Sequence, residues 1–206
     1  MFDCIVPAAG ASSRMGRLKP LLPFAGSTII ETAVVSALKA GCRVLLVVGH
    51  GAARVSAPFL SDSYRRSREG GRLLLIRNPR WERGLLGSIQ AALPFVEGEA
   101  FFVAHADMPF IGSGTYGALA HCRAERLSSG PIPRGEAAVI AAHEGGRGHP
   151  ALLPTAWISE MLALEPRGKM KDFLAGKTAI LAEAGPGAVR DIDTPMDYRR
   201  ALSVRP

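Results

Sequence analysis

The chain has 206 residues, an apolar content of 48% and a formal net charge of +7. This length suits one domain with a complete hydrophobic core, so we expect residues 1–206 to form a single domain. No apolar run approaches the ~20 residues that span a bilayer, and no signal peptide is evident at the N-terminus. Cys4, Cys42 and Cys122 are scattered without a CxxC pair, which favours a reduced, cytoplasmic location over a disulfide framework or a zinc site.

The excess positive charge could serve nucleic acid or small anionic substrates. The densest basic stretch is Arg65-Arg66-Ser67-Arg68, followed by Arg72. It contains no interleaved aromatic residues and falls where the pattern predicts a loop, so we interpret it as a solvated connector. The sequence therefore predicts neither a nucleic-acid partner nor a membrane partner.

Apolar, β-rich segments alternate with helical patterns along the first two thirds of the chain. The predicted strands are Cys4–Ala8, Arg43–Val48, Leu73–Arg77, Phe101–His105 and Ala137–Ala142. The predicted helices are Thr28–Leu38, with a Thr28/Glu31 capping box and a stop at Gly41, then Ala52–Leu60, Ser88–Leu93 and Thr115–Arg126. Continuous apolar strands separated by helices predict a three-layer α/β fold with a mostly parallel central sheet.

The chain after Ala142 is less regular. His143–Pro150 is rich in glycine, and Leu164–Lys177 mixes proline, glycine and charged residues. We interpret residues 143–180 as an excursion that carries the pocket for a second substrate, rather than as a separate domain. Ligands of parallel sheets bind beyond the carboxyl ends of the strands, so such a pocket is expected there.

The most informative segment is the loop at residues 7–19, Pro-Ala-Ala-Gly-Ala-Ser-Ser-Arg-Met-Gly-Arg-Leu-Lys, directly behind the apolar run Cys4-Ile5-Val6. Its small residues let backbone N–H groups approach a polyphosphate, and Arg14 and Lys19 add fixed positive charge. The spacing matches neither the dinucleotide fingerprint nor the Walker loop. The loop therefore predicts a nucleotide triphosphate site of another kind.

Two aspartates are candidate metal ligands. Asp107 follows the strand Phe101–His105 and precedes Met108-Pro109; a carboxylate there suits Mg²⁺, and the alternative is simple turn capping. Near the C-terminus, the run Thr194-Pro195-Met196-Asp197 predicts a helix start with Thr194 as the cap. That role does not involve the preceding Asp191 and Asp193, of which Asp193 is the preferred candidate for binding metal. His105 is expected to be buried in the packing of the sheet.

Two further segments could contact substrates. Asn78-Pro-Arg-Trp-Glu-Arg-Gly-Leu-Leu-Gly-Ser88-Ile follows a predicted strand. There Ser88 could hydrogen-bond a base edge or could merely cap the helix, and Trp81 is interpreted as a packing residue. Arg147-Gly148-His149-Pro150 places a histidine beside basic and glycine neighbours, where His149 could contact a phosphate.

These motifs, in this order, resemble the nucleotidyltransferase family that includes the cytidylyl- and guanylyl-transferring enzymes of molybdenum-cofactor synthesis. The resemblance covers Ala-Ala-Gly-x-Ser-x-Arg-Met-Gly-x-x-Lys, Asp-x-Pro, Asn-x-x-Trp-x-x-Gly-x-x-x-Ser-Ile and Gly-His-Pro. It implies a Rossmann-like nucleotidyltransferase fold and Mg²⁺-dependent transfer. By the resemblance, Arg14, Lys19 and Asp107 are catalytic, Asp107 and Asp193 bind the metal, and His149 binds the acceptor. The implied nucleotide-binding residues are Ala8, Ala9, Gly10, Ala11, Ser12, Ser13, Arg14, Lys19, Asn78 and Ser88.

The same resemblance suggests the substrates. Ala9 stands where guanylyl-transferring relatives usually have glycine, which narrows the base pocket and favours CTP. The implied acceptor is the phosphate of molybdopterin, and a molybdenum hydroxylase is a candidate partner. Arg167–Leu174 departs from the family's glycine-rich acidic segment, which leaves the acceptor open. The alternatives are another small-phosphate or sugar-phosphate nucleotidyltransferase and a non-catalytic nucleotide-binding regulator or chaperone of a molybdoenzyme.

Overall fold

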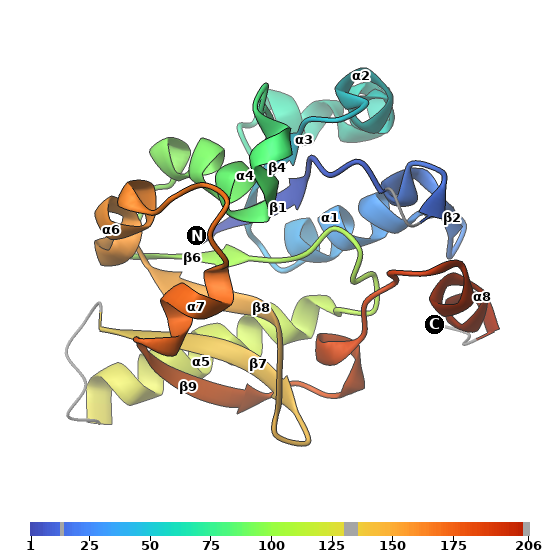
Figure 1. Ribbon diagram of the computed structural model, residues 1–206. Helices are drawn as coiled ribbons and strands as arrows, with labels where there is room; N and C mark the ends of the chain where they lie inside the picture. The colour runs from blue at the N-terminus through green and yellow to red at the C-terminus, as the bar shows by residue number, and fades with distance from the viewer. Residues whose placement is uncertain (13–14, 130–135, 204–206) are drawn as a thin grey trace.

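The computed structural model describes residues 1–12, 15–129 and 136–203. Seven strands form the central sheet in the order β5-β4-β1-β6-β8-β7-β9 (Figure 1). Their bounds are β1 Asp3–Ala8, β4 Arg43–Val48, β5 Leu73–Arg77, β6 Ala100–Val103, β7 Ala137–His143, β8 Gly146–Pro154 and β9 Thr178–Glu183. Within this sheet, as far as the structure describes the chain, β8 alone runs antiparallel to its neighbours. The predicted mostly parallel sheet is confirmed.

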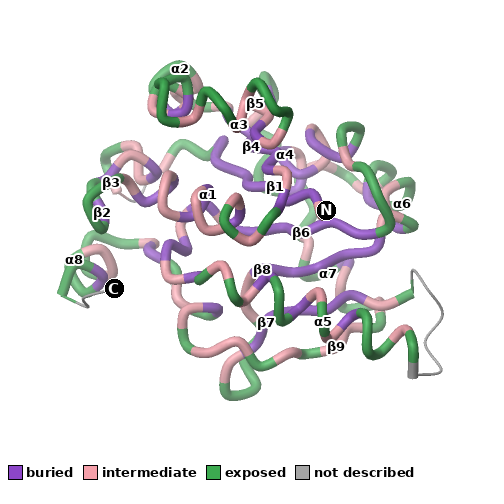
Figure 2. Tube along the Cα trace, turned by 180° about the vertical axis from the view of Figure 1, so that it is seen from behind, coloured by how far each residue is buried: buried purple, intermediate pink, exposed green. Residues whose placement is uncertain are grey.

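Helices cover both faces of the sheet, which gives three layers (Figures 1 and 2). Alternate strand residues, such as Cys4 and Val6, pack against α1 (Ile29–Lys39), α5 (Ser113–Ser129) and the segment formed by α2 (Ala52–Ser56) and η3 (Ala57–Leu60). The residues between them, such as Ile5, pack against α4 (Gly84–Ala92), α6 (Ile158–Ala163) and α7 (Met170–Ala175). Burial of both faces explains why the strands are continuously apolar.

The first helix begins where its capping box predicts. Thr28 Oγ1 accepts a hydrogen bond from the Glu31 amide at 3.3 Å and donates one to Glu31 Oε2 at 2.8 Å. The helix ends at Lys39, and Gly41 then adopts a φ of +84°, a conformation that glycine reaches at little cost. Residues within one turn of each end therefore determine where α1 begins and where it ends.

The segment after Ala142 is more regular than the sequence indicates. Strands β7 and β8 form a hairpin whose two loop residues, Glu144 and Gly145, have φ values of +49° and +79°. This is the geometry that tight hairpins require, so the glycines near residue 145 make a turn and not an irregular stretch. β8 lies in the middle of the sheet, and part of the segment 143–180 is therefore sheet core rather than an excursion.

The C-terminal segment returns to the carboxyl end of β6. The helix α8 (Pro195–Ser203) begins with the predicted box, since Thr194 and Asp197 exchange hydrogen bonds. Tyr198 donates to the Pro23 carbonyl at 2.7 Å, which docks α8 on the small hairpin β2 (Pro23–Phe24) and β3 (Ser27–Thr28). Just before the helix, the Ile192 amide donates to the Asp107 carbonyl at 3.0 Å. This contact places the next residue, Asp193, near Asp107.

Several boundaries differ from the predictions. The strand predicted to end at His105 ends at Val103, the helix predicted from Ser88 begins at Gly84, and the connector at Arg65 contains a short helix, α3 (Arg65–Glu69). The remaining elements are 3₁₀ turns: η2 Lys19–Leu21, η4 Asp62–Tyr64, η5 Trp81–Arg83, η6 Leu93–Phe95, η7 Thr155–Trp157 and η8 Pro186–Val189. Within the described residues, no helix has the length and apolar character needed to cross a membrane.

Candidate active site

The loop after β1 is held against the carboxyl end of β4. The His50 amide donates to the Ala9 carbonyl at 2.9 Å. Gly49 packs so closely that a Cβ there would lie 2.7 Å from Ala9 Cβ and 2.5 Å from Trp81 Cβ. The two predicted nucleotide-binding positions Ser13 and Arg14 lie outside the described residues. The described part of the loop thus follows a fixed path along the sheet edge.

The same loop positions Lys19. Ser12 has a φ of +53°, and its Oγ accepts a hydrogen bond from the Lys19 amide at 3.1 Å. Lys19 opens the short turn η2, where Pro20 is buried. The backbone of the loop therefore helps to determine the position of the Lys19 side chain.

Lys19 lies between the two predicted metal ligands. Its Nζ is 2.6 Å from Asp107 Oδ2 and 2.8 Å from Asp193 Oδ1. The lysine side chain is 14% exposed, against 24% for Asp107 and 40% for Asp193. Burial lowers the pKa of Lys19, but the charges and hydrogen bonds of the two aspartates outweigh it and raise the pKa overall. The predicted meeting of Asp107 and Asp193 is found, with an ammonium group between them that the sequence did not indicate.

The donor set suits a hard divalent cation. Asp107 Oδ1 is buried and has no hydrogen-bond partner among the described residues, which is a costly state for a carboxylate oxygen. The nearby carboxyl of Asp191 has a raised pKa because burial and the charges of Asp193 and Asp107 disfavour its ionised form. Within the described chain no three acidic, histidine or cysteine side chains cluster tightly enough to hold a metal alone. Mg²⁺ commonly takes one or two carboxylates and completes its shell with phosphates and water.

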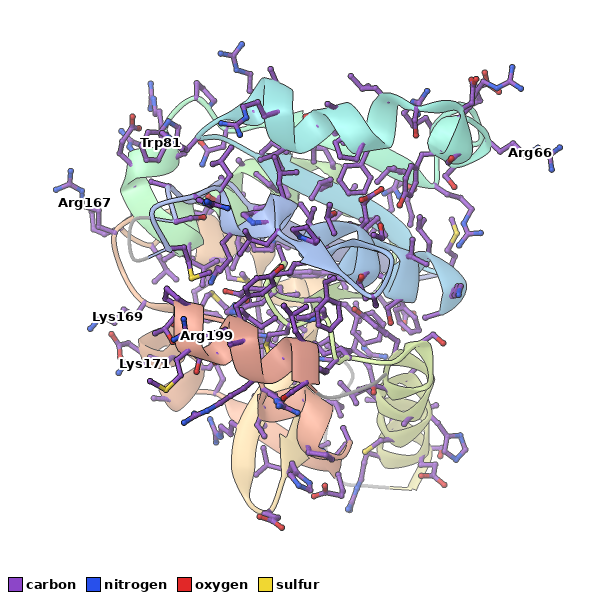
Figure 3. All side chains as sticks on the ribbon, turned by 90° about the vertical axis from the view of Figure 1, so that its right-hand side faces the viewer. Arg66, Trp81, Arg167, Lys169, Lys171 and Arg199 are labelled. Atoms are coloured by element: carbon purple, nitrogen blue, oxygen red, sulfur yellow. The ribbon has the colours of Figure 1, made fainter. Side chains whose placement is uncertain are left out.

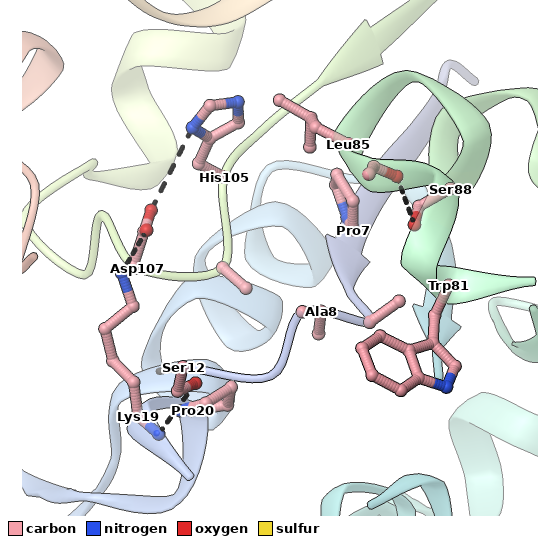
Figure 4. Close-up of a pocket in the computed structure, with 14 residues that line it drawn as sticks. Pro7, Ala8, Ser12, Lys19, Pro20, Trp81, Leu85, Ser88, His105 and Asp107 are labelled. Carbon is pink, nitrogen blue, oxygen red and sulfur yellow. Dashed lines mark hydrogen bonds and ion pairs between the residues drawn. The ribbon is translucent and has the colours of Figure 1, made fainter. Parts of the chain in front are cut away.

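A first cavity of about 280 Å³ opens beside these residues (Figure 4). Asp107 and Lys19 lie at one end of it, and Trp81 and Ser88 lie at the other. Its lining comprises Pro7, Ala8, Ala9, Gly10, Ser12, Lys19, Pro20, Trp81, Gly84, Leu85, Ser88, His105, Ala106 and Asp107. Small side chains and loop backbone thus line the cavity next to Lys19 and Asp107, which is an arrangement that a nucleotide site requires.

Of the predicted nucleotide-binding residues that the structure describes, two do not line this cavity. Ala11 is exposed, and Asn78 is buried behind Ser88, with its Nδ2 3.2 Å from Ser88 Oγ. Ser88 does not cap α4 either, because it lies in the second turn and donates to the Gly84 carbonyl at 3.1 Å. Asn78 therefore orients Ser88, while Ser88 and the indole of Trp81 form the wall of the cavity.

A second cavity of about 500 Å³ adjoins the first. Its floor is largely apolar, with residues such as Ile89, Val103 and Leu153. Among the described residues, its lining includes five cationic residues and no carboxylate; the cationic residues are Arg83, Arg147, Arg167, Lys169 and Lys171. Figure 3 shows Arg167 and Lys169 extending outward on the same side of the molecule as Lys171. This arrangement suits a partly apolar molecule with negative charge.

His105 is not part of the sheet packing, contrary to the sequence-based expectation. It lies beyond the end of β6, lines both cavities, and stacks on His149 with ring centroids 3.7 Å apart and an angle of 26°. Burial lowers the pKa of His105, although the charge of Asp107 opposes this. Burial and the neighbouring His105 lower the pKa of His149 to about 3. Both imidazoles are therefore neutral at pH 7.

Comparison with known proteins gives a consistent assignment. Residues 4–183 match the model of the MobA-like NTP transferase domain. The molybdenum cofactor cytidylyltransferase of Escherichia coli is 29% identical over 95% of this chain and 93% of its own length. The nicotine blue oxidoreductase of Paenarthrobacter nicotinovorans is 32% identical over 56% of this chain and 53% of its own. The solved structure of a nucleotidyl transferase from Methanothermobacter superposes with a TM-score of 0.75 at 23% identity, and the match covers 98% of this chain and 96% of that one.

The family match spans most of the chain and includes the loop at residues 7–19, Asp107 and the β7–β8 hairpin. The structural match independently supports the three-layer fold. Because the family model matches most of its length, this chain belongs to the MobA-like NTP transferase family of nucleotidyltransferases.

Proposed function

We propose that this nucleotidyltransferase moves a cytidylyl group from CTP to the phosphate of molybdopterin and releases pyrophosphate. The supporting observation is the pair of adjoining cavities, one beside Lys19, Asp107 and Asp193 and the other surrounded by cations. An acceptor oxygen attacks the α-phosphorus in line, and the bond between the α-phosphorus and the β-bridging oxygen breaks. Such chemistry depends on positioning and on neutralising charge.

The nucleotide fits the first cavity. The backbone from Ala8 to Ser12 provides N–H groups at the triphosphate end, and Arg14 is the expected partner of the leaving phosphates. Lys19 balances the charge that develops around the α-phosphate. Ala9 and Trp81 both approach Gly49 closely, so the room at the base end is limited, which supports a pyrimidine over a guanine.

Asp107 and Asp193 would hold a Mg²⁺ ion, which neutralises phosphate charge when bound. The unpartnered Oδ1 of Asp107 supports this role. Lys19 then has to leave at least one of its two carboxylates, and it becomes available to a phosphate oxygen. The residues that bind metal and the residue that binds phosphate are thus in contact before substrates arrive.

The acceptor fits the second cavity. Molybdopterin has a flat heterocycle and a phosphate, which match an apolar floor with cations around it. The curated relative from Escherichia coli, named for its action on molybdenum cofactor, supports this choice. His149 borders the cavity and stays neutral, so it can contact the acceptor without adding charge. A molybdenum hydroxylase is then the expected recipient of the product, and the three free cysteines support a cytoplasmic location.

The test is pyrophosphate release from mixtures of CTP, GTP or ATP with Mg²⁺ and either molybdopterin or a set of sugar phosphates. We expect release with CTP and molybdopterin, and at least tenfold less with GTP. Release only with sugar phosphates would establish the small-phosphate alternative. Tight CTP binding without release from any pair would establish the non-catalytic regulator.

A further inference from the structure

The two cavities share three lining residues: Gly84, Leu85 and His105. Glycine has no side chain, and the side chain of leucine is apolar. His105 is therefore the one polar side chain common to both linings in the described part of the chain. Two substrates of a transfer reaction have to meet where their cavities meet, because the reacting atoms need close contact. His105 therefore stands at the place where an acceptor would reach the nucleotide.

The ring of His105 is held in a defined orientation. Its neighbour in the stack, His149, belongs to β8 and has Nδ1 3.4 Å from the carbonyl oxygen of Val103 in β6. Val103 pairs with Ala151 in the register of these two strands. Each ring of the stack thus belongs to a segment fixed by the sheet, because His149 lies in β8 and His105 follows β6 closely. A donor anchored in this way can fix a bound group within a narrow range of positions.

The hydrogen-bonding capacity of this ring is unused by the protein. In the described residues His105 makes no hydrogen bond, and its closest carboxylate contact, from Nδ1 to Asp107 Oδ1, is 3.9 Å. That distance is too long for a hydrogen bond. The side chain is 27% exposed and faces both cavities. A partly buried polar ring that faces two cavities and has no hydrogen-bond partner among the described residues points to a ligand as the missing partner.

We propose that His105 is a positioning residue that holds the acceptor's phosphate at the junction of the two cavities through an imidazole N–H. It forms no bond to phosphorus; the acceptor oxygen is the nucleophile, and Lys19 and the aspartates act on the nucleotide side. The inference rests on the proposed function in two respects: the nucleotide occupies the first cavity, and the second substrate presents a phosphate in the second cavity. It applies to any phosphate acceptor and does not depend on molybdopterin.

The first test compares His105→Leu, His105→Gln and the control His143→Leu. His143 has nearly the same side-chain exposure, 26%, but lines neither cavity. With molybdopterin as acceptor, we expect His105→Leu to raise the acceptor KM at least tenfold with a CTP affinity within twofold of wild type. His105→Gln keeps a donor and should recover most of the loss, and His143→Leu should match wild type. Equal acceptor KM values in all four proteins would overturn the proposal.

The second test needs no acceptor. Wild-type protein is saturated with α,β-methylene-CTP and Mg²⁺ and is then titrated with inorganic phosphate, while the histidine ring signals are followed by NMR. We expect saturable shifts at His105 and none at His143 or at the exposed His121. Absence of a shift at His105, or equal shifts at all three, refutes its role. A shift without any transfer to molybdopterin refutes the proposed acceptor and leaves the role of His105 intact.

Discussion

Replacing Lys19 by methionine tests the centre of the site. The change removes an ammonium group that lies 2.6 Å and 2.8 Å from two carboxylate oxygens and leaves Asp107 and Asp193 facing each other. Breaking a fully buried ion pair costs about 3–5 kcal/mol. The contact of Lys19 with Asp193 is worth at most about 1 kcal/mol, because Asp193 is 40% exposed, so the total lies below the cost of a fully buried pair. We therefore expect a loss of roughly 2–4 kcal/mol, which lowers the Tm by roughly 4–16 °C in a domain of this size.

Thermal unfolding with and without Mg²⁺ measures this effect. Mg²⁺ should raise the Tm of Lys19→Met more than that of wild type, because the ion replaces the missing positive charge between the aspartates. The exposed Lys39 supplies the control variant Lys39→Met, for which a change below about 0.5 kcal/mol is expected. A Lys19→Met protein as stable as the control, with no added response to Mg²⁺, would refute the reasoning.

The pH dependence follows from the raised pKa of Lys19. A raised folded-state pKa means that the contribution of the lysine is fully present below its unfolded value of about 10.4 and is lost only as the pH rises through the folded value. The Tm difference between wild type and Lys19→Met should therefore stay constant from pH 6 to pH 9. A difference that vanishes within this range would contradict the ion pair.

Three further changes probe other parts of the site. Gly49→Ala should cost about 1–3 kcal/mol and raise the KM for CTP, because the new Cβ meets Ala9 and Trp81; calorimetry and kinetics check this. The pKa of His149 is lowered to about 3, so the free energy of unfolding of wild type should fall by up to about 1.4 kcal/mol per pH unit as the pH drops below 6.5. Thermal melts at several pH values should show a smaller fall for His149→Asn. Charge reversal at Lys169 and Lys171 should raise the acceptor KM severalfold and weaken its salt dependence, with CTP affinity unchanged.

Several features of this protein could be predicted from the sequence because short-range physics determines them. The capping boxes at Thr28 and Thr194 lie within single turns of chain, and both form as predicted. The buried strands show continuous apolar character, which indicated a parallel sheet before any contact was known. The family motifs then placed Asp107 and Asp193 at one site.

The errors have physical causes as well. The glycines at residues 145 and 146 indicated irregular chain, although they serve a tight turn that returns β8 into the sheet. Asn78 and Ser88 were both interpreted as contacts to a nucleotide, and only the packing of α4 decides that one supports the other. His105 was predicted to be buried because it stands where an apolar residue is expected. Instead β6 ends at Val103, and His105 lines the two cavities.

The sequence by itself determined the three-layer architecture, the family and the loop that lines the first cavity. Tertiary structure alone decided that Lys19 bridges two aspartates 88 and 174 residues away. It also decided that His105 stacks on His149 at the junction of two cavities. Local patterns record hydrogen bonds and burial within a few residues, whereas contacts across such separations depend on how α8, β6 and β8 pack together, which no local pattern encodes.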